Sequence, residues 1–468
     1  MSQYACLAYL ALIFPFALAA QVSEFNQIRL DSVAVDEAAD EVLLIDSTGL
    51  IVKRSIEGAG IPTGALMLSD NASDPLLLSS GYRQYGAVFA DIGLTPTDGS
   101  RFGTWTSMAL QITNRRRAQH SATWTDDGML IFGGRDINRI NDPLFYRLSS
   151  DSWEPVSTVD MPSPRQGHST IGRGTSAYIY GGFGPDMPTT ETNLYRYHTP
   201  TNTWFPLASY GGRRSNQSMV LMDDGRMIMW GGETSSLSYF NDGAIYDPDT
   251  DTWSPIADAP LIGRSLHKAI WSEINGKMYV FGGISYGGTN LLPMSYDPNT
   301  DTWEIIPKPT GYNGRIYHTT VFNGRYIYIY GGTNDVAVVQ DDWEYDVLSS
   351  ADPWTRLTEE NSPQQRQYHT AVSTPYGMII WGGSFTSGVP VGKRFNYGCR
   401  CWQDISTISE PTPRIHHSAV WTGSRMIIWG GDGVFSPVGR RNDGAVYDPS
   451  EIGVGPLEYG PLFLYKKS

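Results

Sequence analysis

A repeat of 48 to 51 residues is the feature that most constrains how this chain folds. Glycine pairs close short apolar runs at Gly133, Gly181, Gly231, Gly282, Gly331, Gly382 and Gly430. Tryptophans keep the same spacing at Trp105, Trp153, Trp204, Trp253, Trp303, Trp354 and Trp402. So does Arg-x-x-His, once Arg-x-x-Gln, which begins at Arg117, Arg165, Arg214, Arg264, Arg315, Arg366 and Arg414. One structural unit therefore recurs seven times.

Each repeat has the pattern of four short strands. In the first repeat a strand begins at His120, a tight turn follows at Asp126 to Gly128, and an apolar strand from Met129 ends at the glycine pair. A variable loop leads to a strand that ends in Tyr-Asp-Pro or a variant, and the tryptophan opens the fourth strand. With 50 Gly and 29 Pro in 468 residues, long helices are disfavoured. Four antiparallel strands per repeat predict an all-β, seven-bladed propeller.

The ends of the repeat region predict how the ring closes. The strand at Trp105 precedes any inner strand, and the last third strand, AVYDP from Ala445, has no tryptophan strand after it. We expect the Trp105 strand to complete the last blade, which would remove the free sheet edges. The expected propeller domain is 85–468.

These motifs resemble the kelch family, whose repeat has a second strand ending in Gly-Gly followed by a spaced Tyr and Trp. The resemblance covers roughly residues 85 to 450. It implies the propeller fold and a habit of binding other molecules, but it does not imply a reaction.

The segment before the repeats divides into two parts. Residues 1–20 contain an uncharged apolar stretch with small residues at its end, which predicts a signal peptide cleaved after Ala19 or Ala20. A membrane anchor and a misassigned start are the alternatives. We expect a secreted, periplasmic or cell-surface protein. Residues 21–84 are expected to form a β-rich leader or linker, since VLLID-STG-LIVKR from Val42 is typical of a hairpin; an assembly module is the alternative.

Several classes of function are disfavoured by composition. The net charge of −14 argues against nucleic acid, because binding it depends on Lys and Arg neutralising phosphates. No later stretch is long and apolar enough to span a bilayer. No cofactor is predicted. Cys399 and Cys401 share one face of a strand, and either a strained disulfide or two free thiols fits this spacing.

The histidines do not predict a metal site. The repeat accounts for His120, His168, His267, His318, His369 and His417. His198 and His416 remain, and neither has a local partner at the spacing of metal ligands. Six of the eight histidines are therefore one structural feature repeated.

The connections between strands predict which face is functional. Turns joining the first to the second strand and the third to the fourth are short and uniform, whereas the remaining connections include long, individual loops at the opposite end of each blade. Binding residues gather on such loops. The arginine of each Arg-x-x-His ends a connection on this long-loop face. These seven arginines either stabilise the blades or bind a carboxylate or phosphate, and the candidate ligand-binding residues are Arg117, Arg165, Arg214, Arg264, Arg315, Arg366 and Arg414.

Two hypotheses of function follow. The first is an exported, monomeric kelch propeller that binds a protein or glycan ligand, acidic in character, through the long-loop face. The kelch resemblance permits this, since some kelch domains recognise acidic peptides through arginine. The alternative is a sugar-processing enzyme, a mutarotase or hydrolase, at the channel mouth. It would need a carboxylate there, and Glu233 and Asp432, each next to a glycine pair, are the nearest candidates.

Overall fold

The computed structural model describes residues 102–450, apart from 112–114, 185–191, 340, 385–391 and 435–438, together with strands at 41–45, 51–55, 66–68 and 464–466. The expected signal peptide at 1–20 lies outside the described residues. The chain divides into two compact units, of which the larger comprises residues 101–395 and 401–450. No helix in the described part has the length and apolar character needed to cross a membrane.

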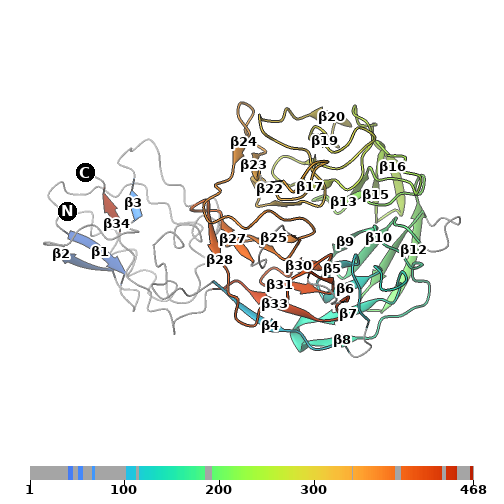
Figure 1. Ribbon diagram of the computed structural model, residues 1–468, viewed down its shortest axis with the longest axis horizontal. Coiled ribbons are helices and arrows are strands. Elements are labelled where there is room, and N and C mark those ends of the chain that lie inside the picture. Colours follow the sequence, from blue (N-terminus) through green and yellow to red (C-terminus); the bar gives the residue numbers. More distant parts are fainter. Residues whose placement is uncertain are drawn as a thin grey trace. The chain divides into compact units, whose positions relative to one another are not determined.

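The larger unit is a propeller of seven four-stranded antiparallel sheets, which confirms the predicted fold class (Figure 1). We number the blades 1 to 7 along the chain. The first strands contact one another in a closed ring and line the central channel. In blade order they are β5 (Ser121–Thr125), β9 (Ser169–Arg173), β13 (Ser218–Leu221), β17 (Lys268–Ser272), β21 (Thr319–Phe322), β25 (Thr370–Thr374) and β30 (Ser418–Trp421).

The second strands are the apolar runs that precede the glycine pairs, and most of their residues are buried. They are β6 (Gly128–Phe132), β10 (Ser176–Tyr180), β14 (Met227–Trp230), β18 (Lys277–Phe281), β22 (Tyr326–Tyr330), β26 (Gly377–Trp381) and β31 (Met426–Trp429). Burial on both faces explains why these strands are apolar throughout rather than alternating.

The third strands are β7 (Leu144–Arg147), β11 (Asn193–His198), β15 (Gly243–Asp247), β19 (Met294–Asp297), β23 (Trp343–Asp346), β27 (Lys393–Asn396) and β33 (Gly444–Asp448). The outer strands are β8 (Ser152–Glu154), β12 (Thr203–Ser209), β16 (Thr252–Pro255), β20 (Thr302–Ile305), β24 (Trp354–Arg356), β28 (Cys401–Asp404) and β4 (Thr104–Ser107). A short 3-10 helix, η2 (Leu148–Ser150), joins β7 to β8, and β29 (Arg414–Ile415) pairs with β32 (Asp432–Gly433).

The last blade combines both ends of the repeat region. Strand β4 pairs antiparallel with β33, with Trp105 opposite Tyr447, and Figure 1 shows this blue strand beside the red one. The Trp105 indole N–H donates to the Ser406 carbonyl of blade 6 at 2.8 Å. In every other blade the tryptophan of the outer strand donates in the same way to a carbonyl of the preceding blade. The repeated tryptophan therefore joins neighbouring blades.

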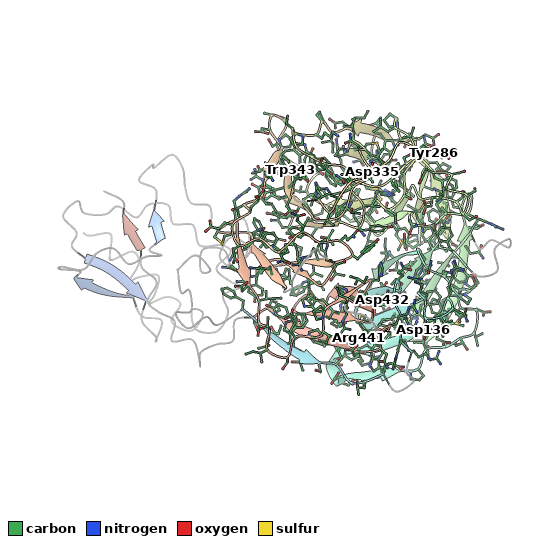
Figure 2. The ribbon with its side chains drawn as sticks, in the orientation of Figure 1. Asp136, Tyr286, Asp335, Trp343, Asp432 and Arg441 are labelled. Atoms are coloured by element: carbon green, nitrogen blue, oxygen red, sulfur yellow. The ribbon has the colours of Figure 1, made fainter. Side chains whose placement is uncertain are left out.

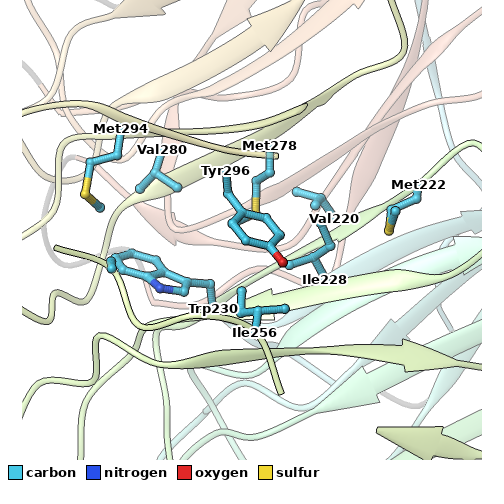
Figure 3. Close-up of a cluster of buried hydrophobic side chains, with 10 residues drawn as sticks. Val220, Met222, Ile228, Trp230, Ile256, Met278, Val280, Met294 and Tyr296 are labelled. Atoms are coloured by element: carbon cyan, nitrogen blue, oxygen red, sulfur yellow. The ribbon is translucent and has the colours of Figure 1, made fainter. Parts of the chain in front are cut away.

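The hydrophobic core lies between the blades. Figure 3 shows one cluster, in which Val220, Ile228 and Trp230 of blade 3 pack with residues of blade 4, namely Met278, Val280, Met294 and Tyr296. Similar clusters join blades 4 and 5, 6 and 7, 7 and 1, 1 and 2, and 2 and 3. Between blades 5 and 6 the rings of Tyr330 and Trp402 lie 5.3 Å apart, so every pair of neighbouring blades shares apolar contacts and the ring is stabilised as a whole.

The glycine pair allows close approach between blades. Gly133 has φ of 67°, and a Cβ there would lie 2.5 Å from the carbonyl oxygen of Arg165 in the next blade. The N–H of Gly134 donates to that same carbonyl at 2.9 Å. The equivalent bond recurs around the ring and ends with Gly431 donating to Arg117. Glycine is required here because a side chain would separate the blades.

The smaller unit contains a four-stranded sheet in the order β2-β1-β34-β3. Its strands are β1 (Glu41–Ile45), β2 (Ile51–Ser55), β3 (Leu66–Leu68) and β34 (Leu464–Lys466). Strands β1 and β2 pair antiparallel, with Glu41 opposite Ser55, where the sequence predicts a hairpin. The small β-rich N-terminal segment is thus present, and β34 comes from the other end of the chain.

Candidate functional site

The long-loop face is built by the connections that enter and leave each blade next to the channel. The residue after each repeat arginine pairs, strand to strand, with the residue after the glycine pair of the same blade, as Ala118 does with Arg135 and Ser215 with Glu233. The equivalent pairing in blade 7 joins Ile415 to Asp432. The glycine-pair loops and the repeat arginines therefore share one face.

Exposed apolar side chains mark several of these loops. Ile137, Leu237, Tyr286 and Val336 follow the glycine pairs of blades 1, 3, 4 and 5, and they are 91%, 57%, 73% and 91% exposed. Single exposed apolar residues also occur in short turns at the opposite end of the blades, such as Ile274 and Tyr376, but these four follow glycine pairs on one face. Four different loops thus offer apolar contacts around one face.

The seven repeat arginines lie beneath this face, and none is more than 3% exposed. Each guanidinium donates to the carbonyl of the first glycine of its own blade, at 3.0 to 3.3 Å. Several also donate to a carbonyl at the start of the third strand, as Arg315 does to Asp341 at 2.7 Å. Each arginine thus joins the loop before its first strand to the loop after its second.

The charge of these arginines is neutralised unequally. Carboxylates pair with Arg214 (Asp242, 2.9 Å), Arg315 (Asp341, 2.6 Å) and Arg414 (Asp443, 3.0 Å). Arg117 and Arg264 have no such partner among the described residues, and burial lowers their pKa to about 9 and about 10. The burial and the carbonyl contacts favour the stabilising role for this set. Ligand binding by these seven arginines stays a prediction.

A collar of left-handed residues surrounds the channel mouth. The third residue of each Arg-x-x-His motif has φ between 53° and 68°: Gln119, Gly167, Asn216, Leu266, Tyr317, Tyr368 and His416. Backbone bonds join members of neighbouring blades, for example from Leu266 N–H to the Asn216 carbonyl at 3.1 Å. Side chains other than glycine rarely adopt this conformation, so its repetition shows that ring geometry imposes it.

The collar's side chains differ from blade to blade. The rings of Tyr317 and Tyr368 lie 4.3 Å apart, and those of Tyr368 and His416 lie 4.4 Å apart. His416 Nδ1 lies 3.1 Å from Asp432 Oδ2. Blades 5 to 7 therefore present an aromatic surface, whereas blades 1 to 3 present Gln119, Gly167 and Asn216.

The two candidate carboxylates at the mouth are both held by neighbouring side chains. Glu233, which is 7% exposed, accepts hydrogen bonds from Asn216 Nδ2 at 2.8 Å and from Ser265 Oγ at 2.9 Å. Burial raises the pKa of Asp432, but His416, Arg440 and Arg135 together hold it below the usual range. These contacts suit residues that shape the mouth.

A group of arginines on blades 7 and 1 was not singled out by the repeat. We call Arg135, Arg139, Arg440 and Arg441 the arginine sector. Arg440 pairs with Asp136 at 3.3 Å and with Asp432 at 3.5 Å, whereas the side chains of Arg135 and Arg441 have no ion pair among the described residues. Figure 2 labels Asp136, Asp432 and Arg441 in this part of the ring. Four guanidinium groups gather here around Asp136, Asp432 and Asp443, in a protein with a net charge of −14.

One sequence signal could have found this sector. The residue after the glycine pair differs in every blade, and Arg135 is its only basic member; the full set is Arg135, Phe183, Glu233, Ile284, Thr333, Ser384 and Asp432. A charged residue that occurs in only one of the seven repeats is not needed to build the blade. The adjacent pair Arg440 and Arg441 in the loop of blade 7 has the same character.

The remaining candidate groups are metal ligands, the two cysteines and the repeat histidines. Within the described residues no group of three or more His, Cys, Asp or Glu is arranged to hold a metal ion. Cys399 and Cys401 are both disulfide-bonded, which is one of the two alternatives that their spacing allows. Of the repeat histidines, His267, His318, His369 and His417 are buried, and His120 and His168 are partly buried.

Comparisons with known proteins agree with the fold. A family model described as the KLHDC2/KLHL20/DRC7 Kelch-repeats domain matches residues 102–259 and 186–383. A leucine-zipper-like transcriptional regulator 1 homolog of Drosophila melanogaster is 26% identical over 321 residues, covering 63% of this chain and 32% of the relative. Kelch domain-containing protein 3 of Homo sapiens is 26% identical over 254 residues, covering 50% and 66%. The alignments therefore span about a third and about two thirds of these relatives' lengths.

One solved structure adds to this comparison. The structure of YjhT aligns with a TM-score of 0.47 and 20% identity, covering 60% of this chain and 94% of that one. The matches to the kelch model together span more than half of the present chain.

Proposed function

Because this chain belongs to the kelch-repeat family, we propose that it binds a protein partner through its long-loop face. Kelch propellers generally act by binding proteins, and the relatives described above share the repeat. The exposed apolar side chains at four loop tips carry the proposal, since a free surface of this kind gains most from being covered by another protein.

We propose further that the partner presents an acidic segment to the arginine sector. Arg135 and Arg441 have no ion pair among the described residues, although Asp432 and Asp443 lie within electrostatic range of them. Guanidinium groups bind carboxylates through paired hydrogen bonds. Ile137, which is 91% exposed, lies on the same loop as Arg135 and Arg139. Apolar and cationic contacts are therefore next to each other, as an acidic segment with one large apolar residue would require.

The test uses fluorescence polarisation with a labelled pool of Asp- and Glu-rich peptides that each contain one Leu or Phe. A matched pool with Asn and Gln in place of the acids is the first control. The double variant R135S/R441S should weaken binding by about 10-fold or more, since hydrogen bonds to charged groups contribute about 1.5–3 kcal/mol. The matched variant is R425S, because Arg425 lies in the short turn between β30 and β31 at the opposite end of blade 7.

Three results would contradict the proposal. The first is equal affinity for the acidic and amide pools, and the second is equal loss in R425S and in the double variant. The third is preference for a sialylated or uronic-acid glycan over every peptide, which would assign the face to carbohydrate. Affinity should also fall as salt rises, because the sector is solvent-accessible.

We also propose that the protein is exported, on the basis of the apolar, uncharged stretch between Tyr4 and Ala20. Expression from Met1 should yield an extracytoplasmic protein whose N-terminus is Ala20 or Gln21. Recovery of the intact N-terminus from the cytoplasm would contradict export.

A further inference from the structure

A belt of hydrogen bonds joins the first strands of neighbouring blades, and it has one break. In five blades a histidine of Arg-x-x-His lies within hydrogen-bond distance of the hydroxyl that begins the first strand of the preceding blade. The pairs are His120 with Ser418, His168 with Ser121, His267 with Ser218, His369 with Thr319 and His417 with Thr370, at 2.7 to 2.9 Å. Blade 3 has Gln217 instead, and its backbone carbonyl accepts from Ser169 Oγ at 2.7 Å.

The break lies between blades 4 and 5. Lys268 occupies the position that holds Ser or Thr in the other six blades. His318, which should pair with that hydroxyl, is 1% exposed, and neither of its ring nitrogens has a hydrogen-bond partner. A buried polar group left in this state costs about 1–3 kcal/mol, so the lysine is unfavourable at a position where serine would serve.

The Lys268 amine projects into the central channel. Its side chain is exposed to water, yet the surrounding protein lowers its pKa by desolvation. It lies within electrostatic range of His267, His318 and His369, which belong to blades 4, 5 and 6. A side chain that water reaches and three blades surround lies inside the ring. Among the described residues it has no hydrogen bond and no ion pair.

An open, mostly apolar pocket of about 400 Å³ lies on the first strands of blades 3 to 7. Ala269, the residue after Lys268, lines it, and so do Trp271, Phe322 and Trp421 on the strands of blades 4, 5 and 7. Cavities that bind small molecules have this size, with mostly apolar walls and few polar groups. Thr320 and Ser373 are the polar residues of the lining, and Lys268 precedes the lining residue Ala269 on the same strand.

We propose that the channel binds a small amphipathic carboxylate, whose head group contacts Lys268 and whose apolar body packs against the aromatic walls. The ammonium offers a positive charge that no protein carboxylate in the described chain neutralises. An ammonium has three N–H donors, so both carboxylate oxygens can accept from Lys268. Because the residues involved line the channel, this inference does not depend on the proposed function of the loops.

The alternative is that Lys268 is merely tolerated in a wide, hydrated channel. In that case its replacement by serine would restore the hydroxyl–histidine bond and change nothing else. The two explanations differ in ligand binding, and both allow the K268S variant to fold, since serine already stands at this position in four other blades. K268M is a second variant that retains side-chain length without the amine.

The experiment measures binding of 3-phenylpropionate by calorimetry, with the neutral 3-phenylpropan-1-ol as the matched ligand. The matched protein variant is K277S, because Lys277 lies on β18 of the same blade and pairs with Glu304. We expect wild type and K277S to bind the acid equally, K268S and K268M to bind it at least about 10-fold more weakly, and wild type to prefer acid to alcohol by a similar factor. K268S should also melt at a higher temperature than wild type.

Equal affinity of K268S and wild type for the acid would overturn the proposal, and so would equal affinity of wild type for acid and alcohol. Absence of wild-type binding at about 10 mM acid would also overturn it, because a site with the charge and walls described must reach millimolar affinity.

Discussion

The repeat arginines and the arginine sector share one face of the propeller but differ in almost every other property. The seven repeat arginines are buried and bound to backbone carbonyls of their own blade. In the sector, Arg440 is paired across blades, and Arg135 and Arg441 have no ion pair in the described chain. A residue that recurs in each blade must have a partner that also recurs, and the backbone supplies one. Residues that occur once are free to serve a ligand, which has no sevenfold symmetry.

The largest expected effect is at Arg315. Its guanidinium pairs with the buried Asp341 at 2.6 Å, and R315A would leave that carboxylate without its cation. Breaking a buried pair from one side costs about 3–5 kcal/mol, so the free energy of unfolding should fall by that amount. Chemical denaturation followed by tryptophan fluorescence measures it. Unchanged stability would place Arg315 with the ligand-binding arginines.

A smaller loss of stability is expected at Arg264, because it lacks, in the described chain, the carboxylate partner that Arg315 has. Arg264 donates to the carbonyls of Gly282 and Leu292 but has no carboxylate partner in the described residues, and its Nη2 has no hydrogen bond. R264A should cost about 1–3 kcal/mol, because only neutral acceptors lose their donor. The same denaturation assay compares it with R315A. A loss at Arg264 larger than that at Arg315 would contradict the charge argument.

The repeat histidines predict a dependence of stability on acid. Burial lowers the pKa of His168, His267 and His417 from 6.5 to about 3, so between these values the unfolded chain binds protons that the folded chain does not. Above pH 6.5 these histidines are neutral in both states and do not reduce the free energy of unfolding. That free energy falls as the pH is lowered towards 3. H267Q, which places at His267 the residue found as Gln217 in blade 3, should reduce that slope by up to about 1.4 kcal/mol per pH unit. An identical slope in H267Q would show that His267 is protonated in the fold.

The smallest effect on stability is expected at Arg441. Its side chain is only partly buried and has no ion pair in the described chain, so R441S should change the free energy of unfolding by less than about 0.5 kcal/mol. Thermal melts of R441S and R425S should coincide with wild type. A clear drop in R441S alone would mean that Arg441 belongs to the structural set.

The sequence predicts the fold well because its markers depend on neighbours that are also repeated. The seven glycine pairs, tryptophans and arginines each make the same contact in every blade, which is why spacing alone indicates seven blades. The long-loop face follows from strand order. What spacing could not predict is where single residues of different loops meet, as Arg440 meets Asp136 across 304 positions of sequence.

The channel site illustrates the same limit. Lys268 departs from the serine or threonine pattern in the sequence, but its meaning depends on the partner that it leaves unsatisfied, His318, fifty positions later in the next blade. The repeat hides such exceptions, since six conforming copies make the seventh look like ordinary variation. Only the contacts show that the exception removes a bond from the belt.

The most direct test measures unfolding free energy and acidic-peptide affinity together, for alanine variants of the seven repeat arginines and serine variants of the arginine sector. We predict two separate groups: repeat variants lose stability and, where folded, retain affinity, whereas variants of Arg135 and Arg441 lose affinity and retain stability. A repeat variant that keeps its stability and loses affinity about 10-fold or more would contradict the division, because it would show a buried, recurring arginine acting on the ligand.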